Sequence, residues 1–326
     1  MLKTPGFLLI AIAFFIAGTL ACVSGRWGIS RPGGRLPVIL DTDIGDDIDD
    51  TWALALLLGS PQVDLKLIVT ETGDTAAKTR LVAKILERMG RTDVAIGTGI
   101  KTGDAVHNQT AWLGDFSLAR YPGVVHADGV QALIDAVNAS PGPVTLCAIG
   151  PETNLREALR RDPAIAKKAR VVAMAGSVFI GYAGKRGRDA EYNVAKDIEA
   201  VRAVFAAPWP ITWAPLDSCG NFRIAGEPFA RLSAAKAPRA RTVMENYALW
   251  AGRKQYPAGE SSILFDTLGA YLCLADELCD MKTVKLRIDD KGFSVPDERG
   301  RAVRCALALK NPGALAERII TALTRP

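Results

Sequence analysis

Short apolar runs alternate with segments of helical periodicity along most of this 326-residue chain. The apolar runs that predict strands lie at residues 37–40, 65–69, 94–96, 143–149, 171–175 and 211–213. The helical patterns between them lie at residues 51–58, 76–89, 130–137, 154–159 and 198–206. Strands that alternate with helices form βαβ units, in which parallel strands lie side by side and helices cover the sheet. The pattern therefore predicts an α/β fold: a mainly parallel open sheet with a Rossmann-like core, flanked by helices.

The C-terminal part departs from this alternation. After Pro228 the pattern is mostly helical, with late strands at 284–288 and 303–309 and a closing helix at 314–323. Hydrophobic residues make up 49% of the chain and charged residues 23%, a balance typical of globular proteins. We expect residues 37–326 to form the folded domain.

The N-terminus has the layout of an export signal. A single cation, Lys3, precedes an apolar run from residue 7 to about residue 20, and Cys22 follows directly. The run is too short for a membrane span, which needs roughly 20 apolar residues. We therefore expect residues 1–22 to be a signal peptide. Cys22 stands where a bacterial lipoprotein is lipidated, although an ordinary cleaved signal with an incidental cysteine is the alternative.

Export of this kind predicts a periplasmic protein or a membrane-anchored lipoprotein in a bacterium, and otherwise a secreted protein. Residues 23–36 are rich in Gly, Ser, Arg and Pro and indicate a tether. The net charge of +5 comes from scattered residues, so nucleic acid is not an expected partner, and the membrane is expected to be contacted only through the lipid.

The chain has too few suitable ligands for a zinc site. It has only two histidines, His107 and His126, and no CxxC motif, which excludes an imidazole-rich or thiolate zinc site.

An acidic run lies between the first predicted strand and the first predicted helix. Six of the ten residues from Asp41 to Asp50 are Asp, and Gly45 permits a tight turn among them. So many carboxylates at a strand end repel one another unless a cation neutralises them, and hard oxygen ligands select calcium or magnesium. The run therefore predicts a divalent-cation site, with a solvated acidic loop as the alternative. A phosphatase nucleophile at Asp41 or Asp43 is a weaker alternative, because Gly45 stands where that motif has Thr.

Polar segments follow four other predicted strands. They are residues 71–74, 150–154, 175–177 and 216–217. Ligands of open α/β sheets bind outside the carboxyl ends of the strands, so these segments and the acidic run are expected to meet at one edge of the sheet. Asn154 is expected to cap the helix that begins beside it.

The motifs resemble those of a known family. Residues 40–45 (LDTDIG) followed by 49–54 (DDTWAL) resemble the DxDPGxDDAxAL signature of the inosine–uridine preferring nucleoside hydrolases. Further blocks follow in the family's order: 148–155 (AIGPETNL), 174–177 (MAGS) with 191–193 (EYN) and Asp197, and 265–269 (FDTLG). Residues 126–129 (HADG) resemble a family His-Gly element. The resemblance covers roughly residues 37–325 and identifies the chain as a divergent, exported member.

The resemblance implies a hydrolase that cleaves the N-glycosidic bond of a ribonucleoside or related N-riboside with a water activated by calcium (Ca2+). It implies that Asp43, Asp50, the backbone carbonyl of Ile149 and Asp266 bind the metal, and that Asp43 is the catalytic general base. It further implies that Asp49, Asp74, Glu191 and Asn193 bind the substrate, together with Asp266. The family also suggests a homodimer or tetramer.

The chain departs from the family pattern at several positions. Ile44 replaces the usual Pro, and two extra residues follow Asp43, so Asp47 competes with the Asp49–Asp50 pair for their roles. We prefer the pair, because a helix start would hold those side chains. Phe265 replaces the His that is thought to protonate the leaving base in purine-active members, and His126 is the only plausible substitute.

These departures leave two other functions open. The first is a non-catalytic lipoprotein that binds a nucleoside or sugar, and the second is a hydrolase of a non-nucleoside glycoside. At the level of single residues, Asp266 could cap its helix, and Glu191 and Asn193 could be solvated in a Gly/Arg-rich loop.

Overall fold

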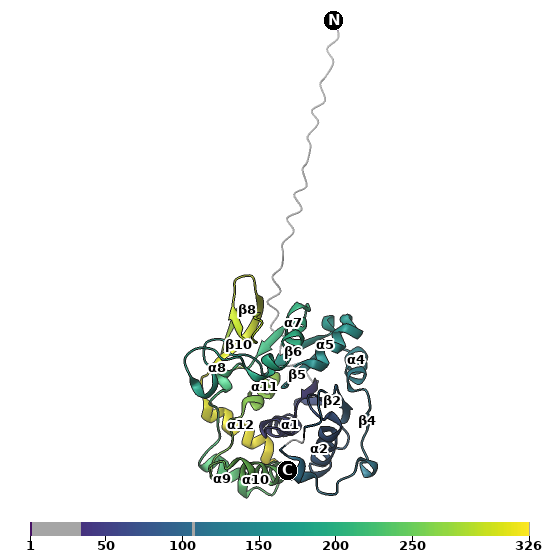
Figure 1. Ribbon diagram of the computed structural model, residues 1–326, viewed down its shortest axis with the longest axis vertical. Helices are drawn as coiled ribbons and strands as arrows, with labels where there is room; N and C mark the ends of the chain where they lie inside the picture. Colours follow the sequence, from purple (N-terminus) through teal and green to yellow (C-terminus); the bar gives the residue numbers. More distant parts are fainter. Residues whose placement is uncertain (2–33, 106–107, 326) are drawn as a thin grey trace.

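The computed structural model describes Met1, residues 34–105 and residues 108–325 (Figure 1). Cys22, the rest of the expected signal peptide apart from Met1, most of the tether and His107 lie outside these residues. The first strand begins at Leu36, so the folded domain starts one residue earlier than we expected.

Ten strands form a single sheet in the order β4-β3-β2-β1-β5-β6-β7-β10-β8-β9. The strands are β1 (Leu36–Thr42), β2 (Val63–Thr70), β3 (Ala95–Thr98), β4 (Val125–His126), β5 (Val144–Ala148), β6 (Ala169–Ala173), β7 (Ile211–Trp213), β8 (Cys279–Ile288), β9 (Ser294–Pro296) and β10 (Arg301–Leu309). All neighbours from β4 to β10 pair in parallel, whereas β8 pairs antiparallel with both β10 and β9. The predicted mainly parallel open sheet is confirmed.

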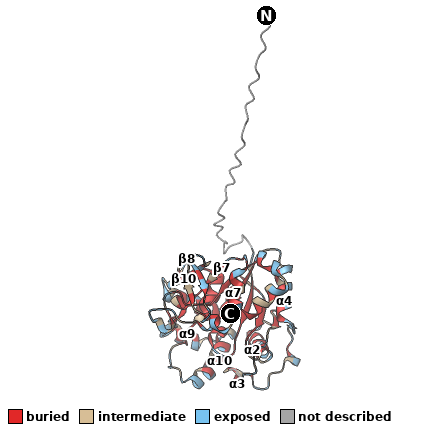
Figure 2. Cartoon of the chain, turned by 45° about the horizontal axis from the view of Figure 1, so that its top comes forward, coloured by how far each residue is buried: buried red, intermediate tan, exposed pale blue. Residues whose placement is uncertain are grey.

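Helices cover both faces of this sheet. They are α1 (Asp49–Gly59), α2 (Thr75–Arg88), α3 (Thr110–Leu113), α4 (Gly129–Ala139), α5 (Thr153–Arg161), α6 (Tyr192–Lys196), α7 (Ile198–Ala206), α8 (Leu216–Cys219), α9 (Glu227–Ala234), α10 (Pro238–Lys254), α11 (Phe265–Leu274) and α12 (Pro312–Thr324), with short 3-10 turns η1 (Leu118–Arg120), η2 (Pro163–Lys167) and η3 (Tyr182–Gly184). Side chains alternate along each strand, so Leu40 packs with α1, α2 and α10–α12 while Ile39 packs with α4, α5 and α7. The buried residues lie along the strands and on the helices that pack against them (Figure 2).

Helix α1 lies inside the first of these layers. All eleven of its residues are buried, and its sequence is apolar on every side after the first turn. A helix of that composition must be enclosed by other elements, and α10, α11 and α12 surround it. Figure 1 shows α1 near the middle of the molecule, beside α12. The acidic start of α1 is thereby held at the carboxyl end of β1.

The sequence pattern did not predict β4 and β9. They have two and three residues, and β4 is exposed, so neither has an apolar run of detectable length. None of the helices within residues 34–105 and 108–325 has the length and hydropathy that a membrane crossing requires.

Candidate active site

A pocket of about 260 Å³ opens at the carboxyl ends of the parallel strands. Seven carboxylates line it: Asp43, Asp46, Asp47, Asp49, Asp50, Glu191 and Asp266. The other lining residues are Asn108, Ile149, Met174, Tyr182, Tyr192, Asn193, Lys254 and Phe265. They come from the loop after β1, the segment before α3, the residues that follow β5 and β6, the turn η3, and the termini of α1, α6, α10 and α11. The acidic run lines this pocket, whereas the other polar segments expected there lie outside its lining: residues 71–74, 150–154, 175–177 and 216–217. Ile149 and Met174, which directly precede two of those segments, take part instead.

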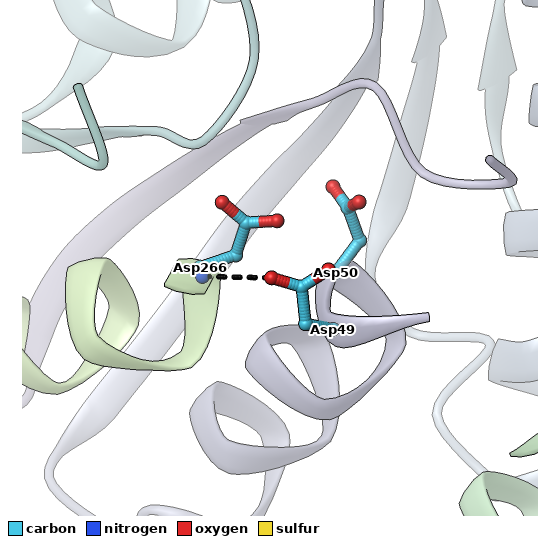
Figure 3. A group of neighbouring side chains, drawn as sticks. All are labelled: Asp49, Asp50 and Asp266. Carbon is cyan, nitrogen blue, oxygen red and sulfur yellow. Dashed lines mark hydrogen bonds between the residues drawn. The ribbon is translucent and has the colours of Figure 1, made fainter. Parts of the chain in front are cut away.

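Three carboxylates form a tight cluster at the base of this pocket. Oxygens of Asp49, Asp50 and Asp266 lie within 4.8 Å of one another, and all three residues are buried. The first two stand in the first turn of α1 and the third in the first turn of α11 (Figure 3). The backbone N–H of Asp266 donates to Asp49 Oδ2 over 3.0 Å, which joins the two helix starts directly.

The start of α1 favours Asp49 and Asp50 over Asp47 as the Asp pair of the site. The helix begins at Asp49, as the preferred interpretation required. Asp47 is exposed on the wall of the pocket, whereas Asp49 and Asp50 are each only 2% exposed. The suggestion that Asp266 caps its own helix is not supported, because Leu264 holds the cap position of α11 and the Asp266 carboxylate is not the acceptor of any first-turn N–H that is described.

Thr42 orients the carboxylate of Asp50. Its hydroxyl donates to Asp50 Oδ1 over 2.5 Å and accepts from the backbone N–H of Ile44 over 3.1 Å. We did not anticipate this role for Thr42. Its position between Asp41 and Asp43, at the end of a buried strand, was the available sequence signal.

A buried lysine supports the acidic loop from below. Lys78 of α2 is 1% exposed, and its ammonium donates to the backbone carbonyl of Asp43 over 2.5 Å. It also lies 3.3 Å from a carboxylate oxygen of Asp46. The sequence analysis missed Lys78, although a lysine on the apolar side of the helical pattern at 76–89 was a usable signal, because lysine is rarely buried without a partner.

The electrostatics of the cluster favour a bound cation. Burial raises the pKa of Asp43 to about 6, although the charge of Lys78 opposes the rise. Burial also raises the pKa of Asp49 to about 7, and it raises the pKa of Asp50 and Asp266 well above the usual range, with neighbouring carboxylates adding to the effect. A divalent cation would replace the protons that these groups otherwise retain. The donor set of carboxylates and a nearby carbonyl suits a hard cation such as calcium or magnesium.

Ile149 lines the same pocket as this cluster. It lies just beyond the end of β5, and its carbonyl oxygen lies 3.4 Å from Asn193 Nδ2. Asn193 Nδ2 also donates to the carbonyl of Met174 over 3.0 Å, which links the ends of β5 and β6.

Glu191 and Asn193 are buried rather than solvated. Glu191 is 1% exposed and caps α6, since its carboxylate accepts from the backbone N–H groups of Gly176, Asn193 and Val194. Burial raises its pKa to about 7 despite these hydrogen bonds. Both side chains line the pocket, as a role in substrate binding requires.

Asp74 does not line the pocket, unlike Glu191 and Asn193. Its carboxylate caps α2 by accepting from the backbone N–H of Ala77 over 3.1 Å, and the residue is not part of the pocket lining. Aspartate is a preferred helix cap, so a structural role accounts for Asp74 and its expected sugar contact has no geometric support.

Asn154 also differs from our expectation. Instead of capping α5, its side chain donates to Asp41 Oδ1 over 2.8 Å and accepts from the backbone N–H of Ile100 over 2.9 Å. It thereby joins the end of β1 to the segments that follow β3 and β5. Asp41 is 1% exposed and does not line the pocket, so it is placed to support the loop rather than to meet a ligand.

The replacement of histidine by Phe265 leaves no proton donor at that position. Phe265 lines the pocket, and its ring lies edge-on to Tyr182 with the centroids 6.1 Å apart. His126 is exposed in the edge strand β4 and is absent from the pocket lining, so it does not substitute for the missing histidine.

The model of the inosine–uridine preferring nucleoside hydrolase family matches residues 38–317. The pyrimidine-specific ribonucleoside hydrolase RihA of Enterobacter sp. (strain 638) is 34% identical over 221 residues, which cover 64% of this chain and 69% of that relative. RihA of Citrobacter koseri is 32% identical with the same coverage.

Solved structures show the same fold. A plant nucleoside hydrolase, PpNRh1, superposes with a TM-score of 0.77 at 22% identity, covering 89% of this chain and 99% of its own. A purine-preferring ribonucleoside hydrolase from Gardnerella vaginalis superposes with a TM-score of 0.73 at 20% identity, covering 88% and 98%. Nucleoside hydrolases are metal-dependent, and the acidic cluster described above is present here. The family match and the shared fold together establish that the chain belongs to the inosine–uridine preferring nucleoside hydrolases, as a divergent member, and is a hydrolase that acts on N-glycosyl bonds.

Proposed function

We propose that this protein is a calcium-dependent ribonucleoside hydrolase with Asp43 as its general base. The observation that supports this most directly is the buried cluster of Asp49, Asp50 and Asp266 in one pocket with Asp43. Asp43, Asp50, the Ile149 carbonyl and Asp266 are the proposed ligands. A set that mixes carboxylates with a backbone carbonyl is typical of calcium, whereas magnesium retains more of its waters.

The reaction needs a water to be deprotonated and the ribose to be held. A calcium ion bound here would lower the pKa of a water and coordinate ribose hydroxyls. Asp43 accepts the proton of the attacking water, and a pKa near 6 suits a base that works near neutral pH. Asp49, Glu191 and Asn193 hold the sugar hydroxyls by hydrogen bonds, which are stronger to charged acceptors. The positive charge that develops on the ribose ring is stabilised by the surrounding carboxylates.

The names of the relatives suggest the class of base. The two curated relatives described above are pyrimidine-specific, and they are more similar in sequence than the solved structures. We therefore propose a pyrimidine ribonucleoside as the preferred substrate.

A nucleoside-binding lipoprotein without turnover is the second candidate. Phe265 favours it, because this side chain cannot protonate a leaving base. The intact pairing of Asp43 with Lys78 favours the enzyme, since a capture protein has no need for a positioned base.

One experiment separates these functions. The purified protein is incubated with uridine, cytidine, inosine and adenosine, with and without EDTA, and free ribose is measured. We expect ribose release that stops in EDTA, returns with calcium, and falls by about 10²- to 10⁴-fold in Asp43→Asn. Nucleoside binding without ribose release would support the capture protein. Phosphate release from p-nitrophenyl phosphate would contradict both.

We also propose that residues 1–22 direct export and that Cys22 becomes lipidated. The support is the sequence pattern of a charged start, an apolar run and a cysteine. Labelling with a radioactive fatty acid in a bacterial host tests this: the label must enter the wild type and not Cys22→Ala. A dimer or tetramer is proposed on family grounds, and light scattering on the purified protein measures it.

A further inference from the structure

Two neighbouring pockets meet at Lys254. The second pocket has a volume of about 280 Å³ and shares Asp47, Asp49, Lys254 and Phe265 with the first. Its remaining wall includes the rings of Trp250 and Tyr256, whose centroids are 5.4 Å apart. Flat aromatic surfaces of this kind fit a planar heterocycle.

The charged side chains that line these pockets are almost all acidic. The first pocket has seven acidic side chains in its lining, and Lys254 is the only Lys or Arg among the described residues that line either pocket. Cleavage of an N-glycosidic bond leaves the electron pair of the C1′–N bond on the base. The carboxylates stabilise the ribose side of that bond, so the base side needs a group of opposite charge.

The end of α10, which carries Lys254, is held against the acidic loop. Lys254 is the last residue of α10, and the indole N–H of Trp250, one turn earlier, donates to the carbonyl of Asp46 over 3.1 Å. The guanidinium of Arg253 donates to the carbonyl of Asn108, another pocket residue, over 2.9 Å. Arg253 is therefore engaged, whereas the exposed side chain of Lys254 is free to reach into either pocket.

Electrostatic coupling supports this placement. Although Asp47 is exposed overall, partial desolvation of its carboxyl in the pocket wall raises the pKa, and the charge of Lys254 opposes that rise. The ammonium group therefore acts on Asp47, which lines both pockets.

We propose that Lys254 is the leaving-group residue of this enzyme and that its ammonium binds a ring carbonyl oxygen of the departing base. This inference rests on the proposed ribonucleoside hydrolysis. As the C1′–N bond breaks, its electron pair passes into the base and onto that oxygen, where the lysine neutralises the charge. The attacking water gives its hydroxyl to C1′ and its proton to Asp43, and the base anion leaves and takes a proton from solvent.

The chemistry of lysine narrows the substrate class. An ammonium group donates hydrogen bonds and accepts none, so it suits a carbonyl oxygen and not an exocyclic amine. The substrates that fit are pyrimidine ribonucleosides, which have a carbonyl next to the glycosidic nitrogen, and uridine is the simplest probe. Adenosine, which has no ring carbonyl, is expected to be a poor substrate.

The test compares two leaving groups in the wild type and in Lys254→Gln. Uridine needs its leaving group stabilised, whereas p-nitrophenyl β-ribofuranoside has a leaving group that departs without help. We expect kcat/KM for uridine to fall about 100-fold or more in Lys254→Gln, and kcat/KM for the nitrophenyl riboside to fall less than about 3-fold. Lys254→Arg, which keeps the charge, should retain most of the uridine activity.

Two further variants serve as controls. Lys236→Gln removes an exposed cation just before the start of α10, outside both pockets, and should leave both activities unchanged. Tyr182→Phe tests the competing donor, because the Tyr182 hydroxyl accepts from the backbone N–H of Tyr192 over 2.9 Å and keeps its own proton to donate. A selective loss of uridine activity in Tyr182→Phe, with Lys254→Gln unaffected, would overturn the assignment of Lys254.

The remaining outcomes distinguish this inference from the proposed function. If the wild type cleaves both substrates and Lys254→Gln lowers both equally or neither, the role of Lys254 is wrong and the hydrolase function stands. If the wild type cleaves only the nitrophenyl riboside, the role of Lys254 is also wrong, because no leaving-group assistance exists. If the wild type cleaves neither substrate in calcium, the proposed function itself fails.

Discussion

At the scale of single residues, the general base and its supporting lysine form one unit. Lys78 lies below the loop and donates to the backbone carbonyl of Asp43. Its positive charge opposes the rise in the pKa of Asp43 that burial causes. Lys78 does not line the pocket, so it is a positioning residue that acts through Asp43.

Replacement of Lys78 by Met tests this unit. Loss of the nearby charge disfavours the anionic form of Asp43, so the acidic limb of the kcat–pH profile should move upward by about one pH unit. The free energy of unfolding should also fall by about 1–3 kcal/mol, because the Asp43 carbonyl loses its buried donor. The measurements are kcat between pH 5 and 9 in saturating calcium, and urea denaturation.

Lys84→Met is the matched control. Lys84 lies on the same helix and donates to the backbone carbonyls of Trp112 and Leu113, away from the pocket. This variant should leave the pH profile unchanged. An identical shift in both variants would mean that Lys78 acts only through general stability.

At the scale of elements, the site depends on how closely α11 approaches the strand ends. Gly269 of α11 faces β5 and β6, and a Cβ placed there would lie 3.2 Å from Ile149 Cγ2 and 3.2 Å from the backbone nitrogen of Met174. Asp266 stands one turn before Gly269 on the same helix. The lack of a side chain at Gly269 thus sets the distance between Asp266 and the Ile149 carbonyl.

Gly269→Ala should push α11 away from the sheet. We expect a loss of about 1–3 kcal/mol in the free energy of unfolding, as for other overpacked positions. We also expect calcium to bind several-fold more weakly, because two proposed ligands move apart. Urea denaturation in EDTA and calorimetric titration with calcium measure the two effects.

Gly252→Ala provides the comparison within a helix. No atom lies within 4 Å of a Cβ placed at this position of α10. The variant should gain about 0.5–1 kcal/mol from helix propensity and bind calcium as the wild type does. Unchanged stability and calcium affinity in Gly269→Ala would contradict this prediction, because α11 would then accommodate a Cβ at this contact without moving.

At the scale of the whole molecule, buried carboxyl groups couple stability to pH. Burial raises the pKa of Asp41 to about 7 and that of Glu152 to about 8, in addition to the groups that line the pocket. These values lie above those of the unfolded chain, near 4. Such groups therefore contribute most stability below about pH 4 and lose it as the pH rises through 6 to 8.

The melting temperature in EDTA should consequently fall between pH 5 and pH 8. Calcium competes with protons for the same carboxylates, so it should raise the melting temperature more at pH 8 than at pH 5. We expect the difference between these two increments to exceed about 5 °C, since 1 kcal/mol shifts the melting temperature by roughly 2–4 °C in a large domain. Scanning calorimetry at both pH values, with and without calcium, measures it; equal increments would contradict the coupling.

Glu152 isolates the part of this effect that is independent of the metal. It is 1% exposed, outside the pocket lining, and neither carboxylate oxygen has a hydrogen-bond partner among the described residues. Glu152→Gln cannot ionise, so in EDTA it should melt higher than the wild type at pH 8 and about equally at pH 5.

Much of the architecture was predictable because it depends on local pattern. The apolar runs and helical periodicities matched the strands of the parallel core and the longer helices, and the rule for open sheets located the pocket at their carboxyl ends. The short strands β4 and β9 were not predicted, because two or three residues are too few to show the alternation of apolar and polar side chains that marks a strand. Asp74 was misjudged because a helix cap and a sugar ligand use the same residue type.

The sequence by itself determined the fold class, the edge of the sheet that holds the site, and the chemical character of the acidic run. Only the tertiary structure decided which side chains meet: Asp49 with the backbone of Asp266, Lys78 with Asp43, and the end of α10 with the acidic loop. The physical reason is that strand and helix patterns arise from neighbours along the chain. Contacts between segments as much as 217 residues apart depend instead on how the layers pack.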